Sequence, residues 1–154
     1  MLQVNRVREL VAEVKEAIPQ IKYAEVLTTD DDFKKFLEER KQSDNIMFFA
    51  VIPDHGLTGT EDRTKYENYI QFFLLEKQTE KNIKHSDKLD LYQRVQIAVK
   101  AFIDMIIEAK SGESDVFSAC NLFSDLNEES IDVKVFWDGV QCRGYEIFMN
   151  ILTK

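Results

Sequence analysis

The sequence has few of the residues that build common catalytic and ligand-binding motifs. Its 154 residues include only five glycines, two histidines, two cysteines and two prolines. It contains no GxxxxGK[ST] phosphate loop, no GxGxxG pattern and no HExxH zinc motif. Two histidines leave little for a zinc site, and no serine or cysteine stands in a nucleophile-elbow context. We therefore expect no catalytic residues, no cofactor and no metal.

Long hydrophobic runs are also missing. The longest one, residues 46–52, is the length of a strand, whereas spanning a bilayer takes about 18–20 apolar residues. Residues 1–18 alternate apolar and charged side chains, without the apolar core of a signal peptide. We expect a cytoplasmic chain that does not bind membranes. Cys120 and Cys142 are far apart and form no CxxC pair, so we expect buried thiols.

Basic residues are in deficit. The chain has 20 basic and 28 acidic side chains, which gives a net charge of −8. Binding to nucleic acid or to anionic lipid needs a basic surface, so we expect neither. The deficit lies in residues 23–45, 46–63 and 113–130, which sum to −3, −2 and −5. A partner that touches the loops at 54–63 and 124–130 should therefore offer basic or hydrogen-bond-donating groups.

Helical periodicity is present in the N-terminal part of the chain. Residues 5–18 predict an amphipathic helix that ends before Pro19, and residues 23–27 predict a short strand. Thr28 and Thr29 then precede three aspartates, and both residue types favour a helix N-terminus. A metal cluster is the alternative for residues 30–32, but consecutive helical residues point in different directions. We therefore predict a second helix that ends near Arg40 and Lys41.

The central part of the sequence predicts two strands and a long helix. Residues 45–52 and 64–77 are predicted strands, joined by a turn at 53–56 and a polar loop through 62. After an exposed connection at 78–85, a helix capped by Ser86 or Asp87 runs to Gly112. About 24 helical residues make a rod of roughly 36 Å, long enough to cross a sheet. Its apolar stripe comprises Leu91, Val95, Ala98, Phe102, Met105 and Ala109, widened by Leu89, Tyr92, Val99, Ile103 and Ile106.

The last quarter of the chain predicts strands. Residues 116–123 are a predicted strand, followed by an acidic loop at 124–130. From Ile131 to Trp137 apolar and polar residues alternate, which indicates a strand with one dry face. Asp138-Gly139 is typical of a hairpin turn into a return strand that carries Tyr145, Ile147, Met149 and Ile151 on one side.

The register of this hairpin follows from its apolar residues. A two-residue loop at 138–139 would set Ile131 opposite Glu146 and so mix the two faces. One additional residue, in the loop or as a bulge near Arg143-Gly144, sets Ile131 opposite Ile147 and Val133 opposite Tyr145. We predict that extra residue.

The order of the elements predicts the fold class. Helices and grouped hairpins are typical of an α+β fold, here a mainly antiparallel sheet with N-terminal helices and a long central amphipathic helix packed on it. No internal repeat or change of composition divides the chain. We expect residues 1–154 to form a single domain.

Two groups of residues are candidates for function. Asp54 and His55, with Glu61 and Asp62 nearby, form an acid–base cluster in a loop that also contains Leu57. A solvated turn is the favoured interpretation of this loop. A nuclease-like set of Asp54 with Asp132 and Lys134 is disfavoured, because a long helix lies between them in the sequence.

The C-terminal hairpin carries the second group. Trp137, Tyr145 and Phe148 are a candidate aromatic platform, with packing inside the protein favoured over an interface. Phe136 and Phe148 give this hairpin a second apolar face, which a helix or another subunit is expected to cover.

In element order the sequence resembles small tail proteins of tailed bacteriophages, namely tail terminator, tail-completion or neck proteins. The elements concerned are the helices 5–18 and 89–109, the strands 46–52 and 66–75, and the ending from Phe136-Trp137-Asp138-Gly139 to Gly144-Tyr145-Glu146-Ile147-Phe148-Met149. The second helix departs from that pattern. The resemblance implies a non-enzymatic structural subunit that assembles into a ring and contacts tail tube or neck proteins. It also implies that the loop 54–63 is an assembly surface and that the chain ends up in a virion or tail-like particle.

Two other hypotheses remain open at this stage. One is a stand-alone cytosolic adaptor that binds a protein or peptide at a sheet edge. The other is a small enzyme with its site near Asp54 and His55, which would need a further ionisable group within hydrogen-bond reach of either residue.

Overall fold

The computed structural model of the chain describes residues 1–60, 63–79, 82–112, 122–137 and 142–153. Its described elements, in chain order, are α1 (Val4–Ala17), β1 (Tyr23–Leu27), α2 (Asp30–Glu39), the 3-10 helix η1 (Gln42–Asp44), β2 (Met47–Val51), β3 (Asp54–Thr58), β4 (Lys65–Lys77), α3 (His85–Ser111), β5 (Leu126–Trp137) and β6 (Cys142–Thr153). The strands form one sheet in the order β1-β2-β4-β6-β5, and β3 also pairs with β4. Only β1 and β2 run parallel; the other pairings are antiparallel. The predicted α+β class is confirmed.

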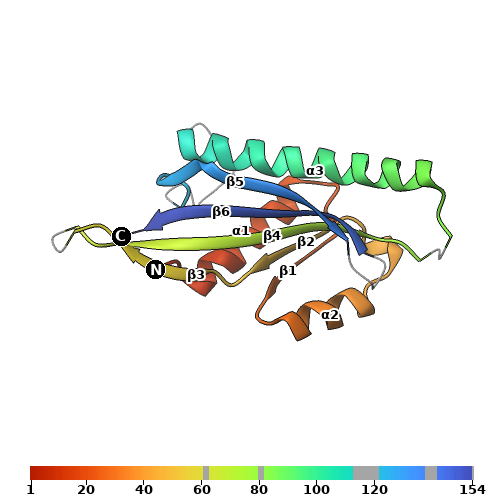
Figure 1. Cartoon of the computed structure of the whole chain (residues 1–154), viewed down its shortest axis with the longest axis horizontal. Coiled ribbons are helices and arrows are strands. Elements are labelled where there is room, and N and C mark those ends of the chain that lie inside the picture. Colours follow the sequence, from red (N-terminus) through yellow and green to blue (C-terminus); the bar gives the residue numbers. More distant parts are fainter. Residues whose placement is uncertain (61–62, 80–81, 113–121, 138–141, 154) are drawn as a thin grey trace.

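The helices cover the two faces of the sheet unequally. Figure 1 shows α3 along one side of the strands and α2 on the opposite side. Side chains of α1 and α3 share one buried cluster with the central strands, whereas α2 contributes to a second, smaller cluster. The first cluster therefore forms the main core, and the second lies only over β1, β2 and adjoining parts of β4, β5 and β6.

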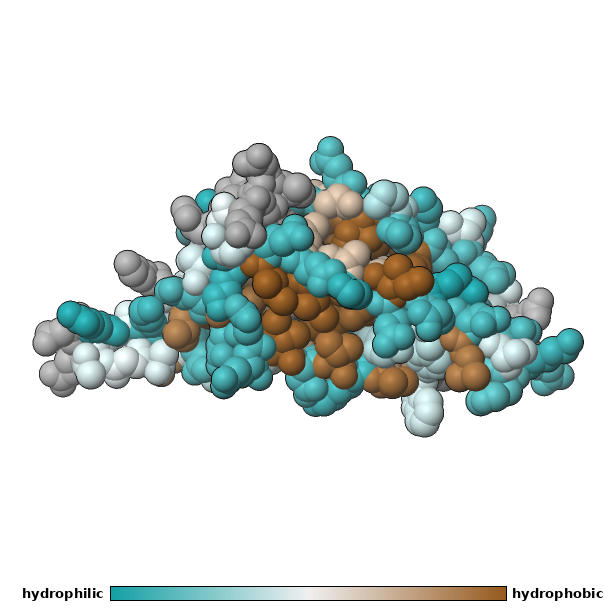
Figure 2. All heavy atoms as spheres, turned by 90° about the horizontal axis from the view of Figure 1, so that it is seen from above, coloured by the Kyte–Doolittle hydropathy of each residue, from teal (hydrophilic) through white to brown (hydrophobic). Residues whose placement is uncertain are grey.

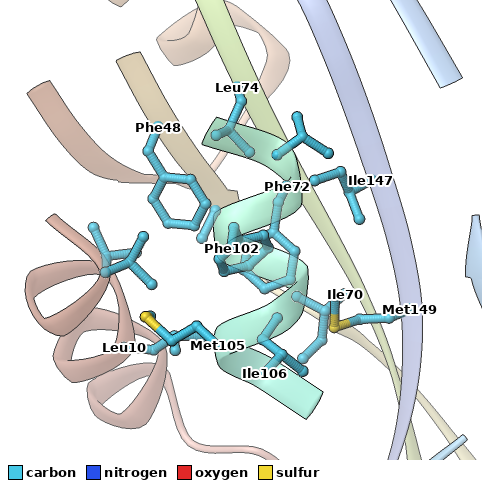
Figure 3. Close-up of a cluster of buried hydrophobic side chains, with 14 of the residues drawn as sticks. Leu10, Phe48, Ile70, Phe72, Leu74, Phe102, Met105, Ile106, Ile147 and Met149 are labelled. Atoms are coloured by element: carbon cyan, nitrogen blue, oxygen red, sulfur yellow. The ribbon is translucent and has the colours of Figure 1, made fainter. Parts of the chain in front are cut away.

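The long helix α3 contributes its predicted stripe to the main core. All six residues of the central stripe are buried, and so are Val99 and Ile106. Phe102 lies among the strand side chains in Figure 3, with its ring centroid 5.0 Å from those of both Phe48 and Phe72. Gly112 has a φ of 75° and its N–H bonds to carbonyls of the last turn, which confirms the predicted left-handed cap. Leu89 is exposed, contrary to the prediction that it widens the stripe.

The predicted start of α3 is wrong, whereas that of α2 is confirmed. α3 begins at His85, and Lys84 precedes it without a side-chain cap, so neither Ser86 nor Asp87 is the cap residue. Thr29 does cap α2, because its side-chain oxygen accepts a 3.1 Å bond from the backbone N–H of Asp32. The three aspartates occupy the first turn of that helix, as predicted.

The C-terminal end of α2 is fixed to the sheet by Lys77 of β4. The Lys77 ammonium donates to the carbonyls of Leu37 and Glu38, at 2.6 and 3.0 Å. These carbonyls belong to the last turn of α2, which has no partner for them inside the helix. Asn45 in turn exchanges two hydrogen bonds with the backbone of Lys77, at 2.9 and 2.7 Å. This lysine therefore joins α2, β4 and the segment before β2.

Two segments predicted as loops are strands. Residues 54–58, predicted as a turn and polar loop, form β3, and residues 126–130, predicted as an acidic loop, belong to β5. Most β3 side chains are exposed, so the segment has no buried face to produce alternation; backbone pairing with the first half of β4 makes it a strand. In β5 the ladder is irregular between Asn127 and Asp132, which removes the alternation there. Of the predicted strand 116–123, only 122 and 123 are described, in a turn.

The predicted hairpin register is wrong by two residues. Val133 lies opposite Ile147 and Val135 opposite Tyr145, whereas the prediction placed Ile131 opposite Ile147. A shift of two keeps every side chain on its predicted face, because side chains alternate with a period of two. Residues 138–141, which include the predicted turn, lie outside the described part of the chain. The face itself is not dry: Val135 and Trp137 are 62% and 74% exposed.

The close approach of β6 to β4 leads to a first prediction. A Cβ atom on Gly144 would lie 2.0 Å from the Leu74 carbonyl oxygen, whereas one on Gly56 would have its nearest neighbour at 3.7 Å. Because the obstacle is backbone, we expect Gly144→Ala to lower the free energy of unfolding by about 1–3 kcal/mol. Gly56→Ala is the matched control and should change it little. Urea unfolding of both variants measures this, and equal midpoints would contradict the close contact.

Candidate protein-interaction surface

The candidate residues of the 54–62 segment lie on β3 or outside the described chain. Asp54, His55 and Leu57 face Tyr69, Asn68 and Tyr66 of β4 across the ladder. Leu57 is 70% exposed and is the large apolar side chain of this strand. Glu61 and Asp62 are outside the described residues. The structure therefore places the first three on an outer strand and not in a loop.

His55 is held by a buried asparagine. Its Nδ1 lies 2.9 Å from Oδ1 of Asn68, which also accepts a 2.8 Å bond from the backbone N–H of Leu2. The Asn68 amide donates to the Ile151 carbonyl at 2.8 Å and to the Thr153 hydroxyl at 3.1 Å. Asn68 is fully buried, so these bonds replace all its contact with water. Asn68 of β4 therefore joins β6, the N-terminal segment and, through His55, β3.

The two phenylalanines predicted to form a second apolar face have different surroundings. Phe136 packs against Phe33 of α2 and Phe73 of β4, with ring centroids 6.0 and 5.2 Å away. A helix of the same chain therefore covers it. Phe148 lies where α2 does not reach, and the ammonium of Lys134 sits 4.9 Å from its ring centroid. Of the two, Phe148 is thus the one beside charged, accessible side chains.

An exposed apolar strip runs along β5, the last strand of the sheet. Val133, Val135 and Trp137 point to the same side as α3 and are 40%, 62% and 74% exposed. Across from them, Ile97 of α3 is 52% exposed. Figure 2 shows hydrophobic side chains gathered in the middle of the side that carries α3. We call Ile97, Val133, Val135 and Trp137 the α3–β5 surface.

A groove accompanies this surface between the helix and the strand. It has a volume of about 530 Å³ and is lined by Ile97, Val99, Ile103, Val133 and Tyr145, with Gln93, Gln96 and Lys100 at its polar side. Tyr145 is half-buried and its ring lies 5.9 Å from that of Tyr92. Burial raises the pKa of Tyr145, so this phenol stays neutral at ordinary pH. The groove is thus mostly apolar and carries no charge other than Lys100.

Charged groups gather at the end of β4 beside the start of α3. The Arg94 guanidinium donates to both oxygens of Glu76, at 2.6 and 3.3 Å, and these bonds raise the pKa of Arg94. The Glu76 carboxylate is nearly buried, so Arg94 compensates its charge.

Over the described residues, no group of three side chains that could bind a metal ion lies together. None of the helices described there has the length and apolar character that spanning a membrane requires. Cys142 is buried, as predicted, and Cys120 lies outside those residues.

Two features of this region, the buried Asn68 and the exposure of the strip on β5, were not predicted from the sequence. In β4 the residues Tyr66, Ile70, Phe72 and Leu74 share one parity, and Asn68 is the polar gap in that series. This gap was a usable signal for a buried hydrogen-bonding side chain. The alternation in β5 identified the correct face, but it could not say whether a helix covers that face.

No protein-family model matches the chain, and no curated protein sequence is significantly similar to it.

Proposed function

We propose that the chain is a non-enzymatic assembly subunit that acts through protein–protein contacts, as the small phage tail proteins it resembles do. The observation that carries the proposal is the α3–β5 surface, an apolar strip on a strand whose outer edge pairs with no described strand. Proteins rarely leave such an edge uncovered, because its free N–H and C=O groups recruit other strands. Contiguous apolar side chains next to it strengthen the case for a partner.

The outer strand β3 supplies a second contact region. Leu57 is exposed there, next to the acidic residue Asp54 and the acidic positions 61 and 62 in the sequence. In a ring each subunit contacts two neighbours, so each subunit needs two contact surfaces. β3 and β5 lie on different sides of the β4–β6 pair and can serve as two such surfaces.

Light scattering at several concentrations, combined with electron microscopy, tests this function. We expect a discrete assembly of more than two chains of 18.0 kDa, visible as a closed ring. Leu57→Lys should reduce the assembled fraction, whereas Leu89→Lys, which changes another exposed leucine on α3, should not. A chain that remains monomeric at every concentration and in mixtures with candidate tail proteins would contradict the proposal.

The adaptor hypothesis is the second candidate, and the same β5 edge favours it. An extended peptide can add to a free strand and place alternate side chains into neighbouring pockets. The groove between α3 and β5 offers such a pocket next to Val133. A monomer that binds one extended peptide with loss of exposure at Trp137, measured by its fluorescence, would favour this candidate over the assembly subunit.

A further inference from the structure

We infer that the partner of the α3–β5 surface is a second copy of the same chain, paired antiparallel through β5 with Val133 on the two-fold axis. The inference deepens the proposed function, on which it rests, by naming the partner of one surface. β5 is the terminal strand of the sheet, and among the described strands it pairs with β6 alone. Its outer edge can therefore pair with a strand of another chain. Two such edges can form a ladder without any rearrangement of the sheet.

The side chains of β5 are complementary to their own reversed sequence. In a two-fold pairing centred on Val133, each residue lies opposite the residue whose number completes the sum 266. Ile131 then faces Val135 of the other copy, and Val133 faces Val133. All these side chains project to the α3 side of the sheet, so the contact is apolar there.

The charges on the other side of the strand match in the same register. Asp132 and Lys134 lie on the face opposite Val133, and within one chain the Lys134 Nζ is 2.9 Å from Oδ2 of Asp132. In the Val133-centred pairing, Asp132 lies opposite Lys134 of the other copy, twice by symmetry. Opposite charges directly across a ladder stabilise it, and like charges destabilise it.

Two-fold pairings of β5 that are centred next to Val133 place these residues unfavourably. A centre at Asp132 or at Lys134 sets two identical charges against each other. A centre between two residues sets apolar side chains opposite polar ones, because a slip of one residue inverts the faces. Among these registers the Val133 centre alone satisfies both faces of residues 131–135, which is why a second copy fits better than an arbitrary strand.

The α3 side adds apolar area to this contact. Ile97 and the groove beside Val133 lie next to the strip. Side chains of the other copy that reach past the two-fold axis therefore contact apolar residues. Val135, which α3 leaves exposed, lies against Ile131 of the other copy and loses contact with water in the paired state. A two-fold contact closes on itself, so it joins two chains, and a larger ring uses another surface in addition.

Charge reversal tests the register directly. In Asp132→Lys both copies present only lysines at 132 and 134, and in Lys134→Asp both present only aspartates. Since each reversal acts on two symmetry-related pairs, we expect each single variant to weaken dimerisation by about tenfold or more. An equimolar mixture of the two should form a heterodimer, because every lysine then faces an aspartate. The double variant, carrying both reversals, should dimerise as the unmodified chain does.

The measurement is sedimentation velocity over a concentration series, with circular dichroism to confirm that each variant is folded. Both residues are exposed, so the substitutions should not disturb the fold. Loss of dimer in the single variants with recovery in the mixture supports the inference. Two results overturn it: dimers that the reversals leave unaffected, or an unmodified chain without a dimer.

The two proposals can fail separately in this experiment. If closed assemblies of many chains form and persist in every variant, the β5 contact is wrong and the assembly role stands. If a β5-dependent dimer forms and no larger assembly or tail partner is found, the contact stands and the assembly role is wrong. A strictly monomeric chain that binds an extended peptide at β5 overturns both and supports the adaptor.

Discussion

Phe102→Ala should lower the free energy of unfolding by about 3–5 kcal/mol, the largest effect that we expect from one substitution. Phe102 is fully buried in the middle of α3 and packs against the rings of Phe48 and Phe72 from two different strands. Removing it leaves a cavity between helix and sheet, as the surroundings in Figure 3 indicate. For a chain of this size, each kcal/mol shifts the melting temperature by roughly 2–4 °C.

Two further variants make this measurement specific. Leu89→Ala changes an apolar residue of the same helix that is 56% exposed, and it should change stability by less than about 0.5 kcal/mol. Phe102→Leu keeps most of the volume and should cost clearly less than Phe102→Ala. Urea unfolding at an unchanged slope gives all three values. If Phe102→Ala costs no more than Leu89→Ala, the proposed packing of α3 on the sheet is wrong.

Asn68→Leu should cost about 2–4 kcal/mol, although leucine has a similar size and is more apolar. The variant loses the acceptor for the Leu2 N–H and for His55, together with the donor to the Ile151 carbonyl. These groups lie at a buried position, so water cannot replace the lost partner freely. The penalty therefore comes from unsatisfied polar groups and not from a cavity.

The control and the local readout separate this penalty from general disturbance. Asn5→Ala removes an exposed amide from α1 and should leave stability within about 0.5 kcal/mol of the unmodified chain. Hydrogen exchange at the Leu2 amide should be slow in the unmodified chain and fast in Asn68→Leu, because that amide loses its acceptor. Unchanged stability together with slow exchange at Leu2 would exclude the role that we give to Asn68.

The features that could be predicted from the sequence are those that depend on residues close together in the chain. The stripe of α3, its Gly112 cap and the Thr29 cap of α2 each depend on spacings of a few residues, and all are confirmed. β3 could not be predicted, because its exposed side chains carry no alternation and its pairing depends on the distant strand β4. Local pattern can report burial, but it cannot report a backbone partner elsewhere in the chain.

The candidate surface shows the same limit. The alternation of Val133, Val135 and Trp137 told which way these side chains point. Whether they are covered depends on where α3 lies across the sheet, and its buried side chains pack over the more central strands. Likewise, Phe136 is covered by Phe33 of α2, which lies about a hundred residues earlier in the sequence. Such outcomes are properties of the assembled layers.

The division of one edge of β4 between β2 and β3 has a dynamic consequence. β2 is buried on both faces and lies between two strands, whereas β3 has mostly exposed side chains and pairs with β4 alone. Local opening is least costly where few buried contacts are lost, so β3 can detach while β2 stays in place. Its departure would break the His55–Asn68 bond and bare the first half of β4. A strand from another molecule could then take the vacated place, so β3 is where exchange of strands between molecules would begin.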